Sequence, residues 1–402
     1  MNALSVYLGD IQVGLLEHFE DESEVFTFSE SYLESHIDSR PVLGQLFEDR
    51  MPRQIHVGGP FGWFEHLLPQ GAMRKWRARH LGIDESNSFE LLAFLGQQLP
   101  GAVVLLPAKS LIERRSPKQL RAEEPQSDAA FRFSLAGVQW KLSARSQGKG
   151  LTTSASASGV EYIAKFDSPE YPGLPRCEFA SMNWAKLAGL TIPQFELRST
   201  GDFDRVPENM PVGNGEVFLC QRFDRCNTHR IHMEDFAQIL DRPSGYEQYR
   251  GSYDEIARIL YWVAPQKLDE FLRVVVFNIC CGNGDAHLKN FSILYEDGRS
   301  ATLSPSYDIV ATVAYLNSKE LALELGGSKR FDNITASRFQ CFVDCMGLSV
   351  AELVSRISDY ATIAVDAWYS KGVKDHFTQH QRSRIEIHVA TIAMQLTSLT
   401  AR

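Results

Sequence analysis

Residues 280–310 read CCGNGDAHLKNFSILYEDGRSATLSPSYDIV, and this stretch says most about the fold. Asp285 and Asn290 stand five residues apart, just before an expected strand over 291–295. The spacing is that of a kinase catalytic loop, D-x-x-x-x-N. A carboxylate can accept the proton of an attacking hydroxyl, and an amide oxygen can ligate Mg²⁺. Asp308, beyond the Asp297-Gly298 turn, would supply a second, charged oxygen ligand. Two alternatives to this kinase interpretation stay open: the spacing of Asp285 and Asn290 could arise by chance, and Asp308 could cap a helix.

A second group of motifs lies upstream of this stretch. In FSLAGVQWKL (133–142), a short loop between apolar positions contains Ser134, Gly137, Gln139 and Lys141. Such a loop could cover nucleotide phosphates or be an ordinary hairpin. In YIAKF (162–166), Lys165 stands in an apolar strand, where a lysine needs an anionic partner. Glu178, which opens the expected helix EFASMNWAKLAG, is the candidate for that partner.

The remaining pattern predicts an α+β chain of two lobes with an accessory domain. Short alternating segments at 5–7, 13–16 and 25–28 predict a small meander, followed by helices over 72–82 and 89–99 and a buried strand over 102–107. Residues 108–130 mix charge with Pro and Ser and predict a linker. Strands follow, ending in FLCQRFDR (218–225) as a hinge, and helices are expected over 270–281, 351–363 and 380–399.

Composition excludes several classes of protein. The 402 residues are 44% hydrophobic and 23% charged, with 41 Lys and Arg against 50 Asp and Glu and a net charge of −9. A protein that coats nucleic acid or anionic membrane is not expected. The run MRKWRARH (73–80) is either a local basic patch or a solvated helix face. The start of the chain lacks a signal-peptide pattern and no stretch is apolar enough to span a bilayer.

The cysteines predict a reducing compartment. There are seven, with no CxxC pair. Cys341 and Cys345 lie four apart and could form half of a zinc site, but no second pair with ligand spacing complements them. Free thiols and a cytoplasmic location are therefore expected.

Taken together, the motifs resemble the HipA-type serine/threonine kinase toxins of bacterial type II toxin–antitoxin modules. Motifs that carry the resemblance occur in family order along nearly the whole chain: GWFEHLLPQG, FELLAFLGQQLPGAVVLLP, FSLAGVQWKL, YIAKF, QRFDR, MEDFAQ, NGDAHLKNFSILY and LSPSYDIV. The resemblance implies a bilobal protein-kinase-like fold. It divides the chain into an N-terminal domain (1–107), a linker (108–130) and a kinase domain (131–402), whose nucleotide lobe covers about 131–225 and whose helical lobe covers about 226–402.

The resemblance also implies a role for each matching residue. Asp285 would be the catalytic base, Asn290 and Asp308 would ligate Mg²⁺, and Lys165 would contact the phosphates of ATP. Further catalytic residues would be Gln238 and Lys289. The nucleotide would also contact Leu135, Ala136, Gly137, Val138, Gln139, Trp140, Gln221, Phe223 and His287. Trp140 departs from the family pattern, since many members have Glu or Pro there, which puts the closed geometry of the loop in doubt.

The implied activity is transfer of the ATP γ-phosphoryl group to a Ser or Thr of a protein. By resemblance the target would be an aminoacyl-tRNA synthetase, glutamyl being the best-known case, and translation would stop. The implied partner is a HipB-like antitoxin, through which any DNA contact would be made. Autophosphorylation of Ser134 would repel ATP, and Lys289 or Arg222 could hold the displaced phosphate. The alternatives are a catalytically weak co-repressor bound to the antitoxin, against which the intact Asp285, Asn290 and Asp308 argue, and a small-molecule kinase.

Overall fold

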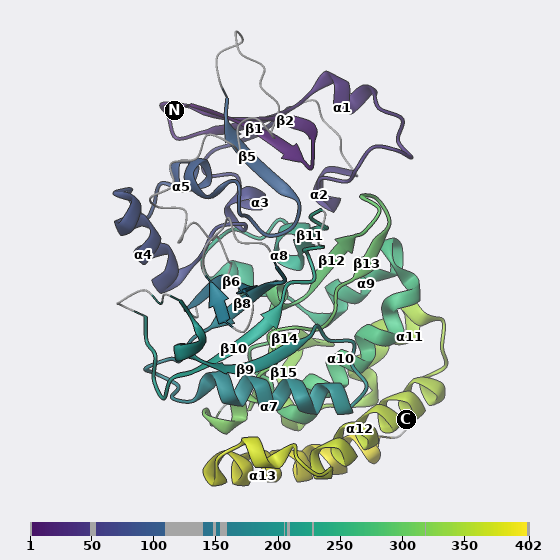
Figure 1. Ribbon diagram of the computed structural model, residues 1–402. Helices are drawn as coiled ribbons and strands as arrows, with labels where there is room; N and C mark the ends of the chain where they lie inside the picture. The colour runs from purple at the N-terminus through teal and green to yellow at the C-terminus, as the bar shows by residue number, and fades with distance from the viewer. Residues whose placement is uncertain are drawn as a thin grey trace.

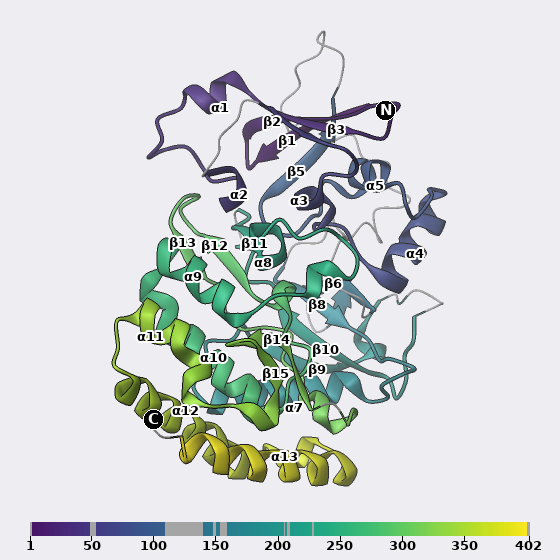
Figure 2. The same cartoon turned by 180° about the vertical axis from the view of Figure 1, so that it is seen from behind.

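In the computed structural model, an N-terminal sheet lies at one end of the molecule and the helices α12 (Val350–Tyr369) and α13 (Gln379–Thr397) at the other (Figures 1 and 2). The structure describes residues 2–48, 54–108, 140–147, 150–152, 159–204, 206, 210–226, 229–317 and 319–399. Ser134 and residues 135–139 of the expected phosphate loop lie outside these ranges, as do residues 109–130 of the expected linker.

The N-terminal unit, residues 2–108, is an antiparallel sheet backed by short helices. Its strands are β1 (Ala3–Leu8), β2 (Ile11–His18), β3 (Glu24–Phe28), β4 (Gln54–Val57) and β5 (Val103–Pro107), in the order β4-β3-β2-β1-β5. The predicted meander is confirmed by β1, β2 and β3, and the predicted buried strand pairs with β1. The helices are α1 (Glu30–Glu34), α2 (Gln45–Glu48), α3 (Gly62–Glu65), α4 (Gly71–Leu81) and α5 (Ser88–Leu95).

Two sequence expectations for this unit need correction. The helix expected over 89–99 ends at Leu95, because the next residue, Gly96, lies against β5. A Cβ on Gly96 would stand 2.3 Å from the carbonyl oxygen of Leu105. The basic run on α4 is not one exposed patch. Arg74 bonds to Ser88 at 2.8 Å, and Arg77 is buried with its guanidinium over the Trp76 ring.

The expected nucleotide lobe contains, in its described part, a second antiparallel sheet and one long helix. The strands β6 (Lys141–Gln147), β7 (Gly150–Thr152), β8 (Glu161–Lys165), β9 (Phe195–Ser199) and β10 (Glu216–Gln221) are ordered β7-β6-β8-β10-β9. The register places Lys141 on β6 opposite Lys165 on β8. Helix α7 (Leu174–Leu187) packs against β9 and β10. This lobe therefore presents two lysines side by side at one end of its sheet.

The helical lobe forms the largest hydrophobic core. Its elements are α8 (Phe236–Ile239), α9 (Tyr253–Val263), α10 (Leu268–Cys281), α11 (Gln340–Met346), α12 (Val350–Tyr369) and α13 (Gln379–Thr397), a sheet of β11 (His232–Asp235), β12 (Ser292–Tyr295) and β13 (Ala301–Leu303), and the hairpin β14 (Glu320–Leu325) and β15 (Ser328–Arg330). All three predicted helices are present. Helix α12 extends to Tyr369, beyond the predicted 363, because Ala364, Ala367 and Trp368 continue its buried face.

Both lobes share that core, which fixes their relative placement. The Trp184 indole of α7 lies 4.7 Å from the Trp368 ring of α12 and donates to the carbonyl oxygen of Ala364 at 2.7 Å.

All seven cysteines lie in the described part of the chain and are free thiols. Among the described residues, no helix is both long and apolar enough to cross a membrane.

Candidate active site

A cleft of about 860 Å³ lies where the N-terminal unit and the two lobes meet. Each part of the molecule contributes side chains to its wall, among them His66, Gln70, Trp140, Lys141, Lys165, Gln221, Phe223, Gln238, Asp285, His287, Lys289, Asn290 and Asp308. The cleft thus brings together the described residues that the sequence assigned to catalysis, to nucleotide binding and to metal binding, although the first and last of them, Trp140 and Asp308, lie 168 residues apart in the sequence.

Lys165 lies between two carboxylates at the base of the cleft. Its ammonium donates to Glu178 Oε1 at 2.5 Å and to Asp308 Oδ1 at 2.6 Å, and the Lys165 and Glu178 side chains are 6% and 0% exposed. The expected anionic partner of this strand lysine is therefore Glu178 on α7. Burial opposes the charge on Lys165, but Asp308 and Glu178 outweigh burial and raise its pKa. Burial raises the pKa of Glu178 to about 7, and the nearby ammonium limits that rise.

Asp308 adopts a backbone conformation that residues other than glycine rarely take. Its φ is 58°, in the left-handed region, which Asp tolerates better than most residues at a cost of about 1 kcal/mol. The preceding Tyr307 holds this turn, with its hydroxyl donating to the carbonyl oxygen of Lys289 at 2.8 Å. Burial opposes ionisation of Asp308, but Lys165 and then Lys141 outweigh it and hold its pKa well below the ordinary value. Asp308 is therefore a fixed carboxylate in the cleft.

The expected catalytic loop follows α10, which ends at Gly282 in a left-handed conformation. Asn283 Oδ1 accepts from the Asp285 amide at 3.1 Å, and the Asn290 side-chain amide donates to the Asp285 carbonyl oxygen at 2.8 Å. These bonds fix where Asp285 and Asn290 lie relative to each other in space. The Asp285 side chain is exposed to the cleft, yet the surrounding walls, and then the Asp308 carboxylate, raise its pKa to about 6.

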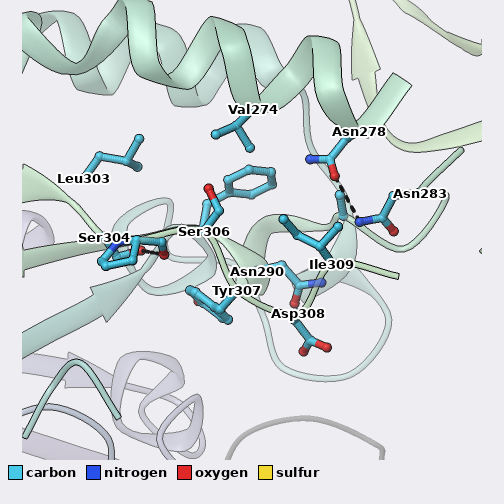
Figure 3. A pocket seen from close by; sticks show the side chains of 13 residues that line it. Val274, Asn278, Asn283, Asn290, Leu303, Ser304, Ser306, Tyr307, Asp308 and Ile309 are labelled. Carbon is cyan, nitrogen blue, oxygen red and sulfur yellow. Dashed lines mark hydrogen bonds between the residues drawn. The ribbon is translucent and has the colours of Figure 1, made fainter. Parts of the chain in front are cut away.

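Asn290 and Asp308 lie beside each other, with their polar ends turned toward the same side (Figure 3). Because the Asn290 amide nitrogen donates within the loop, its oxygen is the atom suited to a cation. One amide oxygen and one carboxylate fit Mg²⁺, which binds few protein ligands and completes its shell with phosphate and water. No group of three His, Cys, Asp or Glu residues in the described ranges could hold a metal, so the zinc half-site of Cys341 and Cys345 has no complement there.

Two further residues lie at the edge of the expected phosphate loop. Lys141, which the sequence places in the loop motif, is the first residue of β6. It is 7% exposed in the cleft wall opposite Lys165, and burial lowers its pKa to about 8. Trp140, the departure from the family pattern, lies 6.3 Å from the Trp76 ring of the N-terminal unit. The tryptophan thus brings the expected nucleotide lobe into contact with α4.

The expected hinge is tied to the N-terminal unit. Gln221 and Phe223 line the cleft, the Phe223 ring lying 5.4 Å from that of Tyr307. Between and beyond them, Arg222 and Asp224 form a buried ion pair at 2.7 Å, and Asp224 Oδ2 accepts from the Gly101 amide at 2.9 Å. Arg222 is therefore already paired, which argues against the expectation that it receives a displaced phosphate.

The other expected catalytic residues make structural bonds. Gln238 Oε1 accepts from the Asp235 amide at 3.0 Å, and its Nε2 donates to the Trp63 carbonyl oxygen at 3.1 Å. Lys289 pairs with Asp235 at 2.6 Å, so it too is unavailable to a displaced phosphate unless this pair breaks. The His287 ring lies 4.6 Å from that of Tyr249, and burial lowers its pKa to about 4, so it is neutral at pH 7.

The fold and the cleft define a two-lobed α+β protein of the kinase-like class, with an added N-terminal unit. Two family descriptions match the sequence: "HipA N-terminal domain" over residues 4–106 and "HipA-like C-terminal domain" over residues 133–368. The chain therefore belongs to the HipA family of kinase-like proteins.

Three relatives illustrate the match. The putative kinase Y4dM of Sinorhizobium fredii is 34% identical over 80% of each chain. The serine/threonine-protein kinase toxin HipA of Shewanella oneidensis is 25% identical over 89% of this chain and 86% of its own. A solved structure of HipA from Shewanella oneidensis MR-1, in complex with HipB and its operator DNA, superposes with a TM-score of 0.68 at 21% identity, covering 98% of this chain and 97% of that one.

Proposed function

We propose that this protein transfers the γ-phosphoryl group of ATP to a Ser or Thr hydroxyl of a protein. One observation carries the proposal: Lys165, paired with Glu178 and Asp308, lies in one cleft with Asp285 and Asn290. A lysine paired with a helix glutamate, a carboxylate base and an Asn–Asp metal pair are the parts that phosphoryl transfer in kinases requires.

Each part has a defined task in this reaction. Lys165 and the adjacent Lys141 bind the phosphates, and Gln221 and Phe223 line the wall where the adenine lies. Asp285 accepts the proton of the attacking hydroxyl, and its pKa of about 6 leaves it ionised at pH 7. Asn290 and Asp308 would hold Mg²⁺, which would neutralise phosphate charge. Holding the two substrates in line supplies most of the remaining rate.

The names of the relatives support the proposed partner, and the proposed substrate rests on the resemblance of the motifs alone. A Shewanella oneidensis relative is a kinase toxin, and a structural neighbour was solved with HipB and DNA. We therefore propose a HipB-like antitoxin as the partner, through which any DNA contact would be made. From the resemblance of the motifs we further propose an aminoacyl-tRNA synthetase as the target. Growth should stop when the kinase is made without the antitoxin.

Autoregulation at Ser134 is part of the proposal. Ser134 precedes the phosphate loop in sequence, and a phosphate there adds about −1.5 to −2 charges, which would repel the triphosphate of ATP. Mass spectrometry of protein incubated with Mg-ATP should find phosphate on Ser134, and the modified protein should bind ATP more weakly than the Ser134→Ala variant. An active enzyme without phosphate on Ser134 would contradict this.

The activity itself can be tested directly. Purified protein is incubated with labelled ATP and Mg²⁺ in a cell extract, and labelled proteins are identified. Wild-type protein should label a target on Ser or Thr, while Asp285→Ala and Asp308→Ala should fold normally and label none. Asp297→Ala, which changes an exposed turn residue near the site in sequence, is the matched control and should label as wild type does. Labelling by Asp285→Ala at the wild-type rate would refute the assignment of the base.

A further inference from the structure

The Lys289 ammonium joins the catalytic loop to the N-terminal unit. Lys289 precedes Asn290 in the loop, and its Nζ donates to Asp235 Oδ2 on β11 at 2.6 Å. The same Nζ donates to the carbonyl oxygen of His66 at 3.2 Å. The Lys289 side chain is 4% exposed. One buried cation therefore holds the catalytic loop, the helical lobe and the N-terminal unit together.

A second route links the same partners. The Tyr249 ring contacts His287 of the catalytic loop at 4.6 Å, and the Tyr249 hydroxyl donates to Gln70 Oε1 at 2.6 Å. Gln70 Nε2 in turn donates to Gln248 Oε1 at 2.5 Å, and the His66 ring bonds to the same oxygen at 3.2 Å. Residues 63–70, here called the docking segment, thus hold the catalytic loop at two places.

The docking segment is anchored on the element that carries Asp235. Trp63 Nε1 donates to Glu234 Oε2 at 3.2 Å, and Gln238 donates to the Trp63 carbonyl oxygen. Glu234 and Trp63 are fully buried. Because a buried polar group that loses its partner is costly, this interface has one preferred arrangement. The β11–α8 element therefore fixes both acceptors of Lys289 at once.

We propose that docking of the N-terminal unit positions the catalytic loop through Lys289, which makes Lys289 a positioning residue and not a catalytic one. The inference rests on the proposed kinase function and adds to it how the active site is assembled. The segment GWFEHLLPQG, which has no chemical role of its own in the proposed reaction, becomes a part of the catalytic machinery by holding the loop that carries Asp285 and Asn290.

Kinetics of Lys289 variants test this assignment. Lys289→Met removes the bridge, and a small displacement of the base should lower kcat about 10- to 100-fold. The KM for ATP should change less than about twofold, because Lys165 and Lys141 contact the phosphates. Lys289→Arg should restore most of kcat. Lys186→Met, an exposed lysine on α7, is the matched control and should behave as wild type.

A second pair of variants separates positioning from chemistry. Asp235→Asn keeps the cap of α8 but removes the charge that fixes Lys289. If Lys289 positions the loop, Asp235→Asn should lower kcat as Lys289→Met does, and the double variant should be no worse than either single one. A Lys289→Met variant that is inactive beside an Asp235→Asn variant of wild-type kcat would overturn the inference and make Lys289 catalytic.

Hydrogen exchange gives a readout that needs no activity. In Lys289→Met, amides of residues 63–70 and 284–292 should exchange faster together, while β8 and β10 should keep their wild-type rates. Faster exchange confined to 284–292, or unchanged exchange in both segments, would overturn the coupling. If the wild-type protein phosphorylates nothing, the proposed function fails, and exchange still decides whether Lys289 couples the two segments.

Discussion

Asp285 should impose a pH dependence on the reaction that an ordinary aspartate would not. The protein walls of the cleft, and then the Asp308 carboxylate, raise the pKa of Asp285 to about 6, against about 3.9 in an unfolded chain. Only the ionised form can accept a proton, so the rate should rise with pH through this value. At pH 7 about nine tenths of the base is ionised and at pH 5 about one tenth, so the rate should fall about tenfold between them.

The assay is kcat/KM for ATP from pH 4.5 to 8, which reports the free enzyme. Binding of a non-hydrolysable ATP analogue over the same range is the control, since it separates titration of the nucleotide from titration of the base. A profile of kcat/KM that stays flat to pH 5 after this correction would refute the reasoning.

Further predictions concern stability. Lys165→Met should lower the free energy of unfolding by about 3 kcal/mol at pH 7.5, because it leaves two carboxylates without their ammonium partner. The loss should be smaller at pH 6, because Glu178 takes a proton as pH falls through about 7, and urea unfolding at pH 7.5 and pH 6 measures this. Asp285→Asn should raise Tm above pH 6 and leave it unchanged at pH 4. The reason is that a carboxyl with a raised pKa lowers the stability of the folded protein as pH rises through about 4 to 6. Scanning calorimetry measures this, and a difference in Tm between variant and wild type that does not change with pH would contradict it. Dithiothreitol should leave Tm unchanged, since the cysteines are free thiols, and a clear drop would reveal a disulfide.

The sequence predicted those parts of the site in which chemistry restricts the residue type. A lysine in an apolar strand requires an acid, and Glu178 lies on the next helix, so this pair is predictable from the residues alone. The start of that helix at Leu174, four residues before Glu178, was not predicted. Asp285, Asn290 and Asp308 lie within one short stretch, where local spacing is informative. Helix types were predictable from periodicity, but the early end of α5 was not, because it depends on the approach of β5 to Gly96.

The contacts of the N-terminal unit could not be predicted in the same way. His66 offers a backbone carbonyl to Lys289, and every residue type has such a group, so no pattern marks it. Gln238 carries the side chain expected in an active site, yet both ends of its amide bind within the protein. Lys141 falls within the loop motif in the sequence. Its place opposite Lys165 depends on strand register, which the sequence does not specify there.

Buried ion pairs explain why the cleft and the N-terminal unit depend on one another. Arg222–Asp224 stands at the hinge and reaches Gly101, while Lys289–Asp235 stands at the catalytic loop and reaches His66. A charge taken out of water is tolerated only while its partners are in place. Separating the N-terminal unit would remove a donor from the first pair and an acceptor from the second, both next to the cleft. The geometry of the cleft therefore depends on the N-terminal unit, because the two buried ion pairs beside the cleft each need a contact from that unit.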